Sequence, residues 1–507
     1  MVTSRRDLLL RAAGLAGLAL TPSLAPGIAR ARLAEDPFSL GVASGEPTAD
    51  GVVLWTRLAP RPLDPDGGMA PEPVEVDWEV YEDQALSRLA ARGREIAVPE
   101  AAHSVHAEVA GLRPDREYWY RFTAGGQASG TGRTRTAPEA GAQAQRLRVA
   151  FGSCQKYEAG YYAAHRRLAD DIPDLVLFLG DYIYEGAATD HGVRRHPGPE
   201  AKDLTGYRLR YGAYKSDPNL QAAHAVAPWM VIWDDHEVEN DYAGDQDPED
   251  STPAAFLLRR AAAYQAYYEH MPLRRPCRPV GPQMLLHRSL DWGQLAQFQL
   301  LDTRQYRPRS PGRLAKRLIH DTIDRNDPRR SILGGPQERW LYEKLATTTA
   351  RWNVLTQQYV LGEMRLPGGW FSSDGWDGYP ACRSRILSQW RDAKVSNPLA
   401  LGGDIHTFVA GDLPGRSGEG PVIASEFVGG SLSSHGYDKM LVGAIRGANP
   451  RVRLAETQYR GYGLMEITPD RCEVAFRAVL NAQAPASPVR TLAKFVVEDG
   501  EAGLKNA

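Results

Sequence analysis

Four short stretches of the chain place acidic, sulfur, phenolic or imidazole side chains directly after an apolar run: residues 151–155, 180–185, 233–242 and 402–407. The side chains in them that commonly bind metals are Cys154, Asp181, Tyr184, Asp235, Asn240, Asp404 and His406. Thiolate, phenolate, carboxylate and imidazole together suit a high-valent transition metal, whereas carboxylate and amide oxygens suit calcium. Because so many carboxylates would repel one another without a cation, the pattern predicts a metal centre.

Each stretch follows a segment with the composition of a buried β-strand. Residues 175–179 form an unbroken apolar run that ends at Gly180, as expected of a strand buried on both faces. Open α/β sheets bind ligands beyond the carboxyl ends of their strands, so we expect the four stretches to converge at one edge of a parallel sheet. The expected strands are 147–152, 175–179, 230–233, 298–301, 352–356, 399–402, 422–427, 464–468 and 471–479, with helices that include 254–270 and 336–350.

The remainder of the chain divides into regions of different character. Residues 36–137 have short strand-like segments at 51–57, 74–81, 105–109 and 117–122, which predict an immunoglobulin-like or fibronectin-like β-sandwich in a supporting role. A linker rich in Pro, Ala, Gly and Gln is expected at 138–145. An α/β catalytic domain is expected at 146–485, followed by a C-terminal tail at 486–507.

The first residues have the pattern of an export signal. Arg5 and Arg6 precede an apolar run that ends near Leu20, and Ala29-Arg30-Ala31 offers a cleavage site between small residues. The pattern predicts a twin-arginine signal peptide at 1–31, recognition by the twin-arginine translocase and a periplasmic or extracellular location. The apolar run is too short to cross a bilayer, and no later run is longer, so we expect no transmembrane segment in the mature protein.

Composition excludes some classes of function. The formal net charge of −2 provides no basic footprint for nucleic acid. Four cysteines in 507 residues are too few for a disulfide framework. We expect Cys154 to be unpaired because it is a candidate ligand, while any pairing among Cys277, Cys382 and Cys472 stays open. The chain is expected to be a monomer.

The motifs also resemble those of a known family. The strings FGSCQ, LGDYIYE, WDDHEVENDY, LDTRQYR and GGDIHTF, in this order behind an all-β region and a twin-arginine signal, resemble the alkaline phosphatase D family of PhoD-type phosphatases and phosphodiesterases. The resemblance covers nearly the whole chain. It implies a metallophosphoesterase fold, which is an α/β fold with a β-sandwich flanked by helices. It also implies hydrolysis of phosphate monoesters, phosphate diesters or both.

The resemblance further implies a ferric ion (Fe3+) together with calcium (Ca2+). Cys154, Asp181, Tyr184 and His406 match the iron ligands. Asp181 would also bridge to calcium, with Asp404 on the calcium side. In the wider fold the 235–237 loop provides a second-metal ligand, here Asp235, and a phosphate-facing group, here His236. Asn240 is a further candidate oxygen ligand.

The expected reaction is attack on the phosphate ester by a metal-activated water or oxo ligand. His236 would donate a hydrogen bond to the phosphate or protonate the leaving oxygen; alternatively, it holds Asp235 in place. Arg304 either binds phosphate as a bidentate donor or forms a structural salt bridge with a neighbouring acid. His435 is expected to be an ordinary loop residue.

Two other functions remain open from the sequence. One is an enzyme that prefers diesters, such as phospholipids or teichoic-acid-like polymers. The other is an extracellular binding protein without activity, which the ligand set at the strand ends disfavours. The polar segments 188–204 and 274–282 are expected to shape access to the site.

Overall fold

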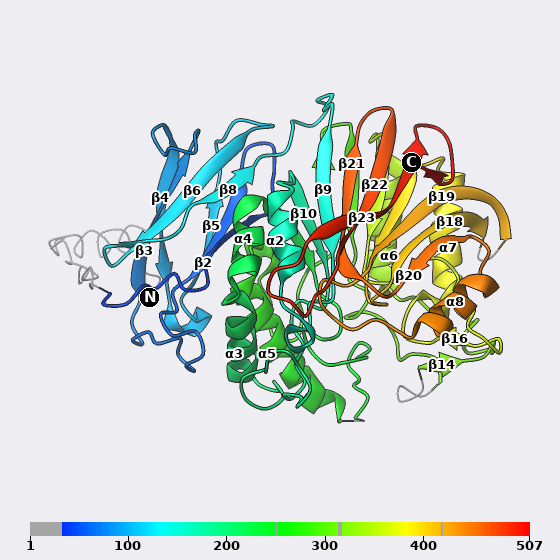
Figure 1. Cartoon of the computed structure of the whole chain (residues 1–507), viewed down its shortest axis with the longest axis horizontal. Helices are drawn as coiled ribbons and strands as arrows, with labels where there is room; N and C mark the ends of the chain where they lie inside the picture. Colours follow the sequence, from blue (N-terminus) through cyan, green and yellow to red (C-terminus); the bar gives the residue numbers. More distant parts are fainter. Residues whose placement is uncertain (1–32, 250, 313–316, 417–418) are drawn as a thin grey trace, which may run out of the picture.

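Two large β-sheets pack face to face in the computed structural model, which describes residues 33–249, 251–312, 317–416 and 419–507 (Figure 1). The expected export signal at 1–31 lies outside the described residues. The first sheet has ten strands in the order β24 (Lys505–Asn506), β23 (Val489–Glu498), β22 (Arg471–Val479), β21 (Arg460–Ile467), β9 (Leu147–Gly152), β10 (Leu175–Leu179), β11 (Pro228–Ile232), β1 (Val42–Gly45), β2 (Val52–Arg57) and β5 (Ser104–Val109).

The second sheet has seven strands and contains the late part of the chain. Their order is β12 (Arg288–Trp292), β13 (Ala296–Leu300), β15 (Trp352–Thr356), β17 (Pro398–Gly402), β19 (Glu419–Gly429), β18 (Phe408–Arg416) and β20 (Val452–Glu456). Strand β19 contacts β9 and β21 of the first sheet, and one continuous apolar core joins the two sheets. A small separate pair, β14 (Leu318–Ile319) and β16 (Phe371–Ser372), lies at the lower right of Figure 1.

The expectation of a single parallel sheet is wrong. Strands β9, β10 and β11 are parallel in the first sheet, whereas β13, β15, β17 and β19 are parallel in the second. The segment that carries residues 402–407 therefore extends from a different sheet than the other three stretches. Strands buried on both faces are apolar throughout in either sheet, so composition gave no means of assigning them to one sheet or the other.

Helices cover the outer sides of the two sheets, which confirms the expected β-sandwich flanked by helices. Against the first sheet lie α2 (Ala163–Asp170), α3 (Leu204–Lys215), α4 (Pro218–Val226) and α5 (Pro253–His270). Against the second lie α6 (Gly334–Thr347) and α7 (Pro380–Asp392), whose apolar side chains share a core with Leu355 and Ala400. Helix α5 begins where the Thr252 hydroxyl accepts a hydrogen bond from the Ala255 amide, with Pro253 in the first turn.

The N-terminal region is all-β, as expected, but one of its two layers is part of the first large sheet. Strand β1 pairs in parallel with β11, with Ser44 opposite Pro228, and β2 and β5 extend the sheet beyond it. The other layer consists of β4 (Leu89–Ala97), β3 (Val74–Tyr81), β6 (Glu117–Ala124) and β7 (Gln127–Ala128), with β8 (Gly132–Arg135) also paired to β6. Apolar side chains of the two layers, such as Leu54 and Phe122, form a second core. None of the helices among the described residues is both long and apolar enough to span a bilayer.

Candidate metal centre

The loops that follow β9, β10 and β17 hold their ligand-type residues in an uncommon backbone conformation. Cys154, Asp181, Asp404 and His406 have φ values of 58°, 59°, 62° and 48°. Residues other than glycine rarely adopt positive φ, and such residues concentrate at functional sites where the surrounding structure holds them. Part of that support is direct, because the Cys154 amide donates to the Gly180 carbonyl at 3.1 Å.

Gly180 is required for the approach of two of these loops. Its φ is +101°, and a Cβ atom at this position would lie 2.5 Å from Cβ of Asp234. The Glu237 carboxylate then joins the two loops, since it accepts hydrogen bonds from the amides of Asp181 at 3.1 Å and Asp234 at 2.9 Å. The predicted turn at Gly180 thus brings the end of β10 against the end of β11.

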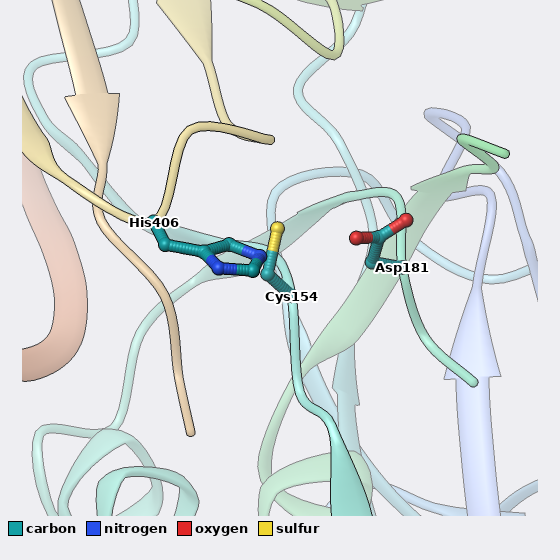
Figure 2. Close-up of side chains that lie close together, drawn as sticks. All are labelled: Cys154, Asp181 and His406. Atoms are coloured by element: carbon teal, nitrogen blue, oxygen red, sulfur yellow. The ribbon is translucent and has the colours of Figure 1, made fainter. Parts of the chain in front are cut away.

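The structure brings the four predicted iron ligands together. One ligand atom each of Cys154, Asp181 and His406 lies within 4.8 Å of the others, and Figure 2 shows these three side chains converging from separate segments. The Tyr184 hydroxyl lies 2.8 Å from Oδ2 of Asp181 and 3.2 Å from Nε2 of His406. The other carboxylate oxygen of Asp181, Oδ1, is buried and has no hydrogen-bond partner among the residues that the structure describes. An unpartnered carboxylate oxygen beside a thiol, a phenol and an imidazole suits a bound cation.

The backbone of His435, which we expected to be an ordinary loop residue, orients the side chain of His406. Its Nδ1 donates a hydrogen bond of 2.6 Å to the carbonyl of His435, so Nε2 is the ring atom that faces Tyr184. Metal-binding histidines in proteins typically donate their second N–H in this way. The prediction that the His435 side chain has no role of its own is untested, but its carbonyl supports the cluster.

A second group shares Asp181 with the first. Ligand atoms of Asp181, Asp235 and His236 lie within 4.8 Å of one another. Nδ1 of His236 lies 2.7 Å from Oε2 of Glu185, a buried carboxylate that also accepts the Asn240 amide at 2.8 Å. The Asp235 carboxylate accepts the amides of His236 and Asp241 at 3.0 and 2.7 Å. The imidazole of His236 therefore lines the cavity, and its contact with Glu185 fixes the orientation of the ring.

A third group contains acids that the sequence analysis missed. Asp241 and Asp374 each lie within 4.8 Å of Asp235 and of one another. Asp374 stands in a Ser-Asp-Gly turn far from any predicted motif, so only the fold places it here. Asp404 lines the same cavity, and the Asn240 side chain oxygen accepts from Arg317 at 3.0 Å. The ligand types at this end are mainly carboxylate oxygens.

Arg304 forms ion pairs with three acidic residues around the site. Its side chain is fully buried, and its nitrogens lie 2.5 Å from Asp234, 3.3 Å from Asp235 and 2.9 Å from Asp374. Nη1 also donates to the Tyr242 carbonyl at 3.3 Å. The guanidinium thus contacts three acids of the site, as the predicted structural salt bridge requires, while the predicted contact with phosphate stays a prediction.

Electrostatics support a cation at the Cys154 end. Burial, together with Asp181 and Asp404, raises the pKa of the Cys154 thiol, and burial also raises the pKa of Tyr184 and of Asp181. The pKa of Asp404 is raised to about 7 by burial and by neighbouring acids. All four groups are thus unfavourable as anions in the protein alone, and a bound cation reverses that preference.

The charge at the other end is partly balanced by the protein. Burial opposes ionisation of Asp235, but Arg304 and His236 outweigh it and hold the pKa of that carboxyl below its usual range. Burial likewise opposes the charge on His236, but Glu185, Asp181 and Asp235 outweigh it and raise the pKa of the imidazole. Asp235 is therefore poised as an anion and His236 as a hydrogen-bond donor.

All three groups face one open cavity of about 450 Å³. Other lining residues are drawn from segments 317–318, 359–377, 404–409, 437–445 and 455, and from 437–445 they are Tyr437, Leu441, Val442 and Ile445. Segments 188–204 and 274–282, which were expected to shape access, contribute no residue to the wall of this cavity. Their role in access stays a prediction.

Comparison with known proteins agrees with this arrangement. Residues 149–476 match the model of the family described as PhoD-like phosphatase, and residues 23–138 match the model of the PhoD-like phosphatase N-terminal domain. The first match contains every predicted ligand, from Cys154 to His406.

Two individual relatives extend the likeness to nearly the full length. The chain is 41% identical to alkaline phosphatase D of Bacillus subtilis (strain 168) over 520 aligned positions, which cover 99% of this chain and 88% of that protein. A solved structure described as that of PhoD superposes with a TM-score of 0.89 at 41% identity, covering 94% of this chain and 92% of the other.

Proposed function

The chain belongs to the PhoD-like phosphatase family and is a phosphoric ester hydrolase, and we propose that it hydrolyses its esters with metal ions held by the three groups described above. The observation that carries the proposal is the convergence of Cys154, Asp181, Tyr184 and His406 beside Asp235 and His236. Because the chain is a phosphoric ester hydrolase, the alternative of a binding protein without activity is not supported.

Iron is the proposed metal at the first group. Cys154, Asp181, Tyr184 and His406 would hold it, because thiolate and phenolate both donate strongly and favour the ferric state. The buried unpartnered oxygen of Asp181 and the fixed orientation of His406 support this choice. A ferric ion bound by phenolate and thiolate is expected to absorb visible light.

Calcium is the proposed metal at the acidic end. Asp181, Asp235, Asn240 and Asp404 would hold it through oxygen atoms, which calcium prefers. Asp374 and Asp241 lie close enough to Asp235 to join the same region, and we add them as candidates. Asp181, which belongs to two of the three groups, is the proposed bridge between iron and calcium.

The residues around the cations would donate protons or hydrogen bonds to the substrate and hold the acidic residues in position. Bound metals would supply Lewis acidity toward the phosphoryl oxygens and would lower the pKa of water. His236 would donate a proton or a hydrogen bond at the leaving oxygen from Nε2, because Glu185 engages Nδ1. Arg304 would act as a positioning residue that keeps Asp235 and Asp374 ionised and in place.

We also propose that the protein is exported and acts as a monomer. The twin arginines and the apolar run at 1–31 support recognition by the twin-arginine translocase. N-terminal sequencing of the secreted or periplasmic protein tests this part, with cleavage after about residue 31 as the expected outcome.

Chelation tests the metal-dependent function. Hydrolysis of 4-nitrophenyl phosphate and of bis(4-nitrophenyl) phosphate is measured before and after treatment with a chelator, and then after adding back iron and calcium separately and together. We expect activity to be lost on chelation and to return only with both metals. Full activity after complete metal removal would refute the proposal. The rates on the two substrates also decide whether a diester-preferring enzyme is the better description.

A further inference from the structure

The cavity is lined by two unlike sets of side chains. Carboxylates and imidazoles of the candidate metal centre line one part, among them Asp181, Asp235 and His406. Apolar side chains of Val360, Met364 and Val409 line another part, and all three belong to or pack against one small apolar cluster. A ligand that fills the whole space would therefore carry both a charged group and an apolar group.

Helix α8 (Lys439–Ala448) provides further apolar lining of the cavity. Leu441, Val442 and Ile445 line the cavity from this helix. Val442 is buried at 7% exposure, but Leu441 is 44% exposed, so water reaches this wall. In Figure 1, α8 lies beside β14 and β16, and Leu318 of β14 lines the same cavity.

The helix is capped at its start and hydrogen-bonded to another segment just after its end. At its start, the Asp438 carboxylate accepts hydrogen bonds from the amides of Met440 at 2.9 Å and Leu441 at 3.0 Å. After its end, the Asn449 side chain makes two hydrogen bonds of 2.9 Å to the backbone of Arg365. An apolar surface open to water is stabilised when an apolar group covers it.

We infer that α8 is a specificity element of the enzyme: the apolar part of the cavity binds an alkyl or aryl group carried by the phosphate ester, and Leu441 and Ile445 determine this preference. The inference rests on the proposed site of hydrolysis. A volume of about 450 Å³ lies within the range of about 300–1,000 Å³ found for small-molecule pockets, so it can hold a medium-length chain as well as the phosphate.

A series of diesters with one leaving group tests the preference. The substrates are methyl, butyl and octyl 4-nitrophenyl phosphates, with 4-nitrophenyl phosphate as the monoester reference, all below their micelle concentrations. Because 4-nitrophenolate leaves in every case, differences in kcat/KM report on binding of the second group. We expect kcat/KM to rise by about tenfold or more from methyl to octyl, since each methylene buried even in part adds roughly a factor of two.

Two variants and a matched control locate the effect on α8. The ratio of octyl to methyl kcat/KM should fall at least severalfold in Ile445→Ser and in Leu441→Ser. It should be unchanged in Met440→Ser, because Met440 lies on the same helix but is 80% exposed and outside the cavity wall. The ratio compares two substrates of one protein, so a partly unfolded sample does not alter it.

The outcomes separate this inference from the proposed function. No hydrolysis of any of the four substrates in the presence of iron and calcium would refute the proposed function. Hydrolysis of the monoester with equal rates along the diester series, or with no diester accepted, would overturn the inference alone. A steep series that is unaffected by both α8 variants would likewise overturn the assignment to this helix.

Discussion

His236 is distinguished among the cavity residues because a buried carboxylate holds its second nitrogen. Glu185 lies 2.7 Å from Nδ1, and the ring packs at 4.1 Å between centroids against Tyr184. A side chain with one nitrogen engaged and its ring packed at a tilt against another ring has little freedom, which suits a group that must meet a reacting oxygen. Such orientation is difficult to infer from sequence, because Glu185 follows a different strand from His236.

Replacing His236 distinguishes its two possible roles. As a proton donor, its loss in His236→Asn should lower kcat toward 4-nitrophenyl phosphate by about 10²- to 10⁴-fold while the metal content stays unchanged. His191→Asn, in an exposed loop, is the matched control and should behave as wild type. Loss of metal in parallel with activity would instead support the alternative that His236 holds Asp235, and wild-type kcat would exclude both roles.

The predictability of single residues depended on where they stand in the chain. Cys154, Asp181, Tyr184 and His406 could be found because each follows an apolar strand, where a ligand is expected. Asp374 and Ser434 could not, because both lie in loops whose composition is that of ordinary turns. Ser434 donates to the Tyr184 hydroxyl at 2.8 Å, a contact between residues 250 positions apart that only the fold creates.

At the scale of elements, the loops after β10 and β11 form one unit. Glu237 joins their backbones, and the approach depends on the missing side chain of Gly180. These loops provide Asp181 and Asp235, and each of the three candidate ligand groups contains at least one of them. A change in how the two loops meet should therefore disturb both metals together.

Gly180→Ala tests this unit. The added Cβ would lie 2.5 Å from Asp234 in a backbone conformation unfavourable for alanine, so the free energy of unfolding should fall by roughly 2–5 kcal/mol. Iron and calcium content should fall with it. The control is Gly186→Ala, whose added Cβ would meet no atom within 4 Å. Wild-type stability and metal content in Gly180→Ala would show that the close approach is not required.

Strands with an apolar run or a clear alternation of apolar and charged residues were the predictable ones. The expected strands at 74–81, 147–152, 175–179, 352–356 and 471–479 match β3, β9, β10, β15 and β22 in their bounds, and the others differ by a few residues. Strands β4, β20 and β23, which are largely or partly exposed, lacked such an apolar run and were missed. Helix α8 was missed as well, because Gly443 and Gly447 weaken its helical pattern.

At the scale of the whole molecule, the first large sheet crosses the expected boundary between domains. Strand β1 pairs with β11, and Trp55 of β2 donates to the carbonyl of Glu269 in α5 at 3.0 Å. Arg57 of β2 lies 2.8 Å from Nε2 of His270. The predicted domain boundary at residues 138–145 stays a prediction. The first large sheet is hydrogen-bonded continuously across the regions on either side of that boundary.

This continuity predicts cooperative unfolding. Calorimetry of the metal-loaded protein should show one transition, because unfolding of β1, β2 and β5 exposes the edge of β11 and part of the core beneath α5. A chain that begins at residue 138 should lack a cooperative transition and should aggregate. Two separate transitions in the full chain, or a stable and active chain from residue 138, would show that the two regions fold independently.

Metal content and the visible spectrum together decide whether Cys154, Asp181, Tyr184 and His406 bind a single ferric ion. Purified protein should contain about one iron atom per chain and a visible absorption band. Cys154→Ala should lose the iron, while Cys382→Ala, which changes another buried cysteine, should keep it. Tyr184→Phe should lose or shift the band. An active protein without iron, or iron and spectrum unchanged in both Cys154→Ala and Tyr184→Phe, would contradict the assignment.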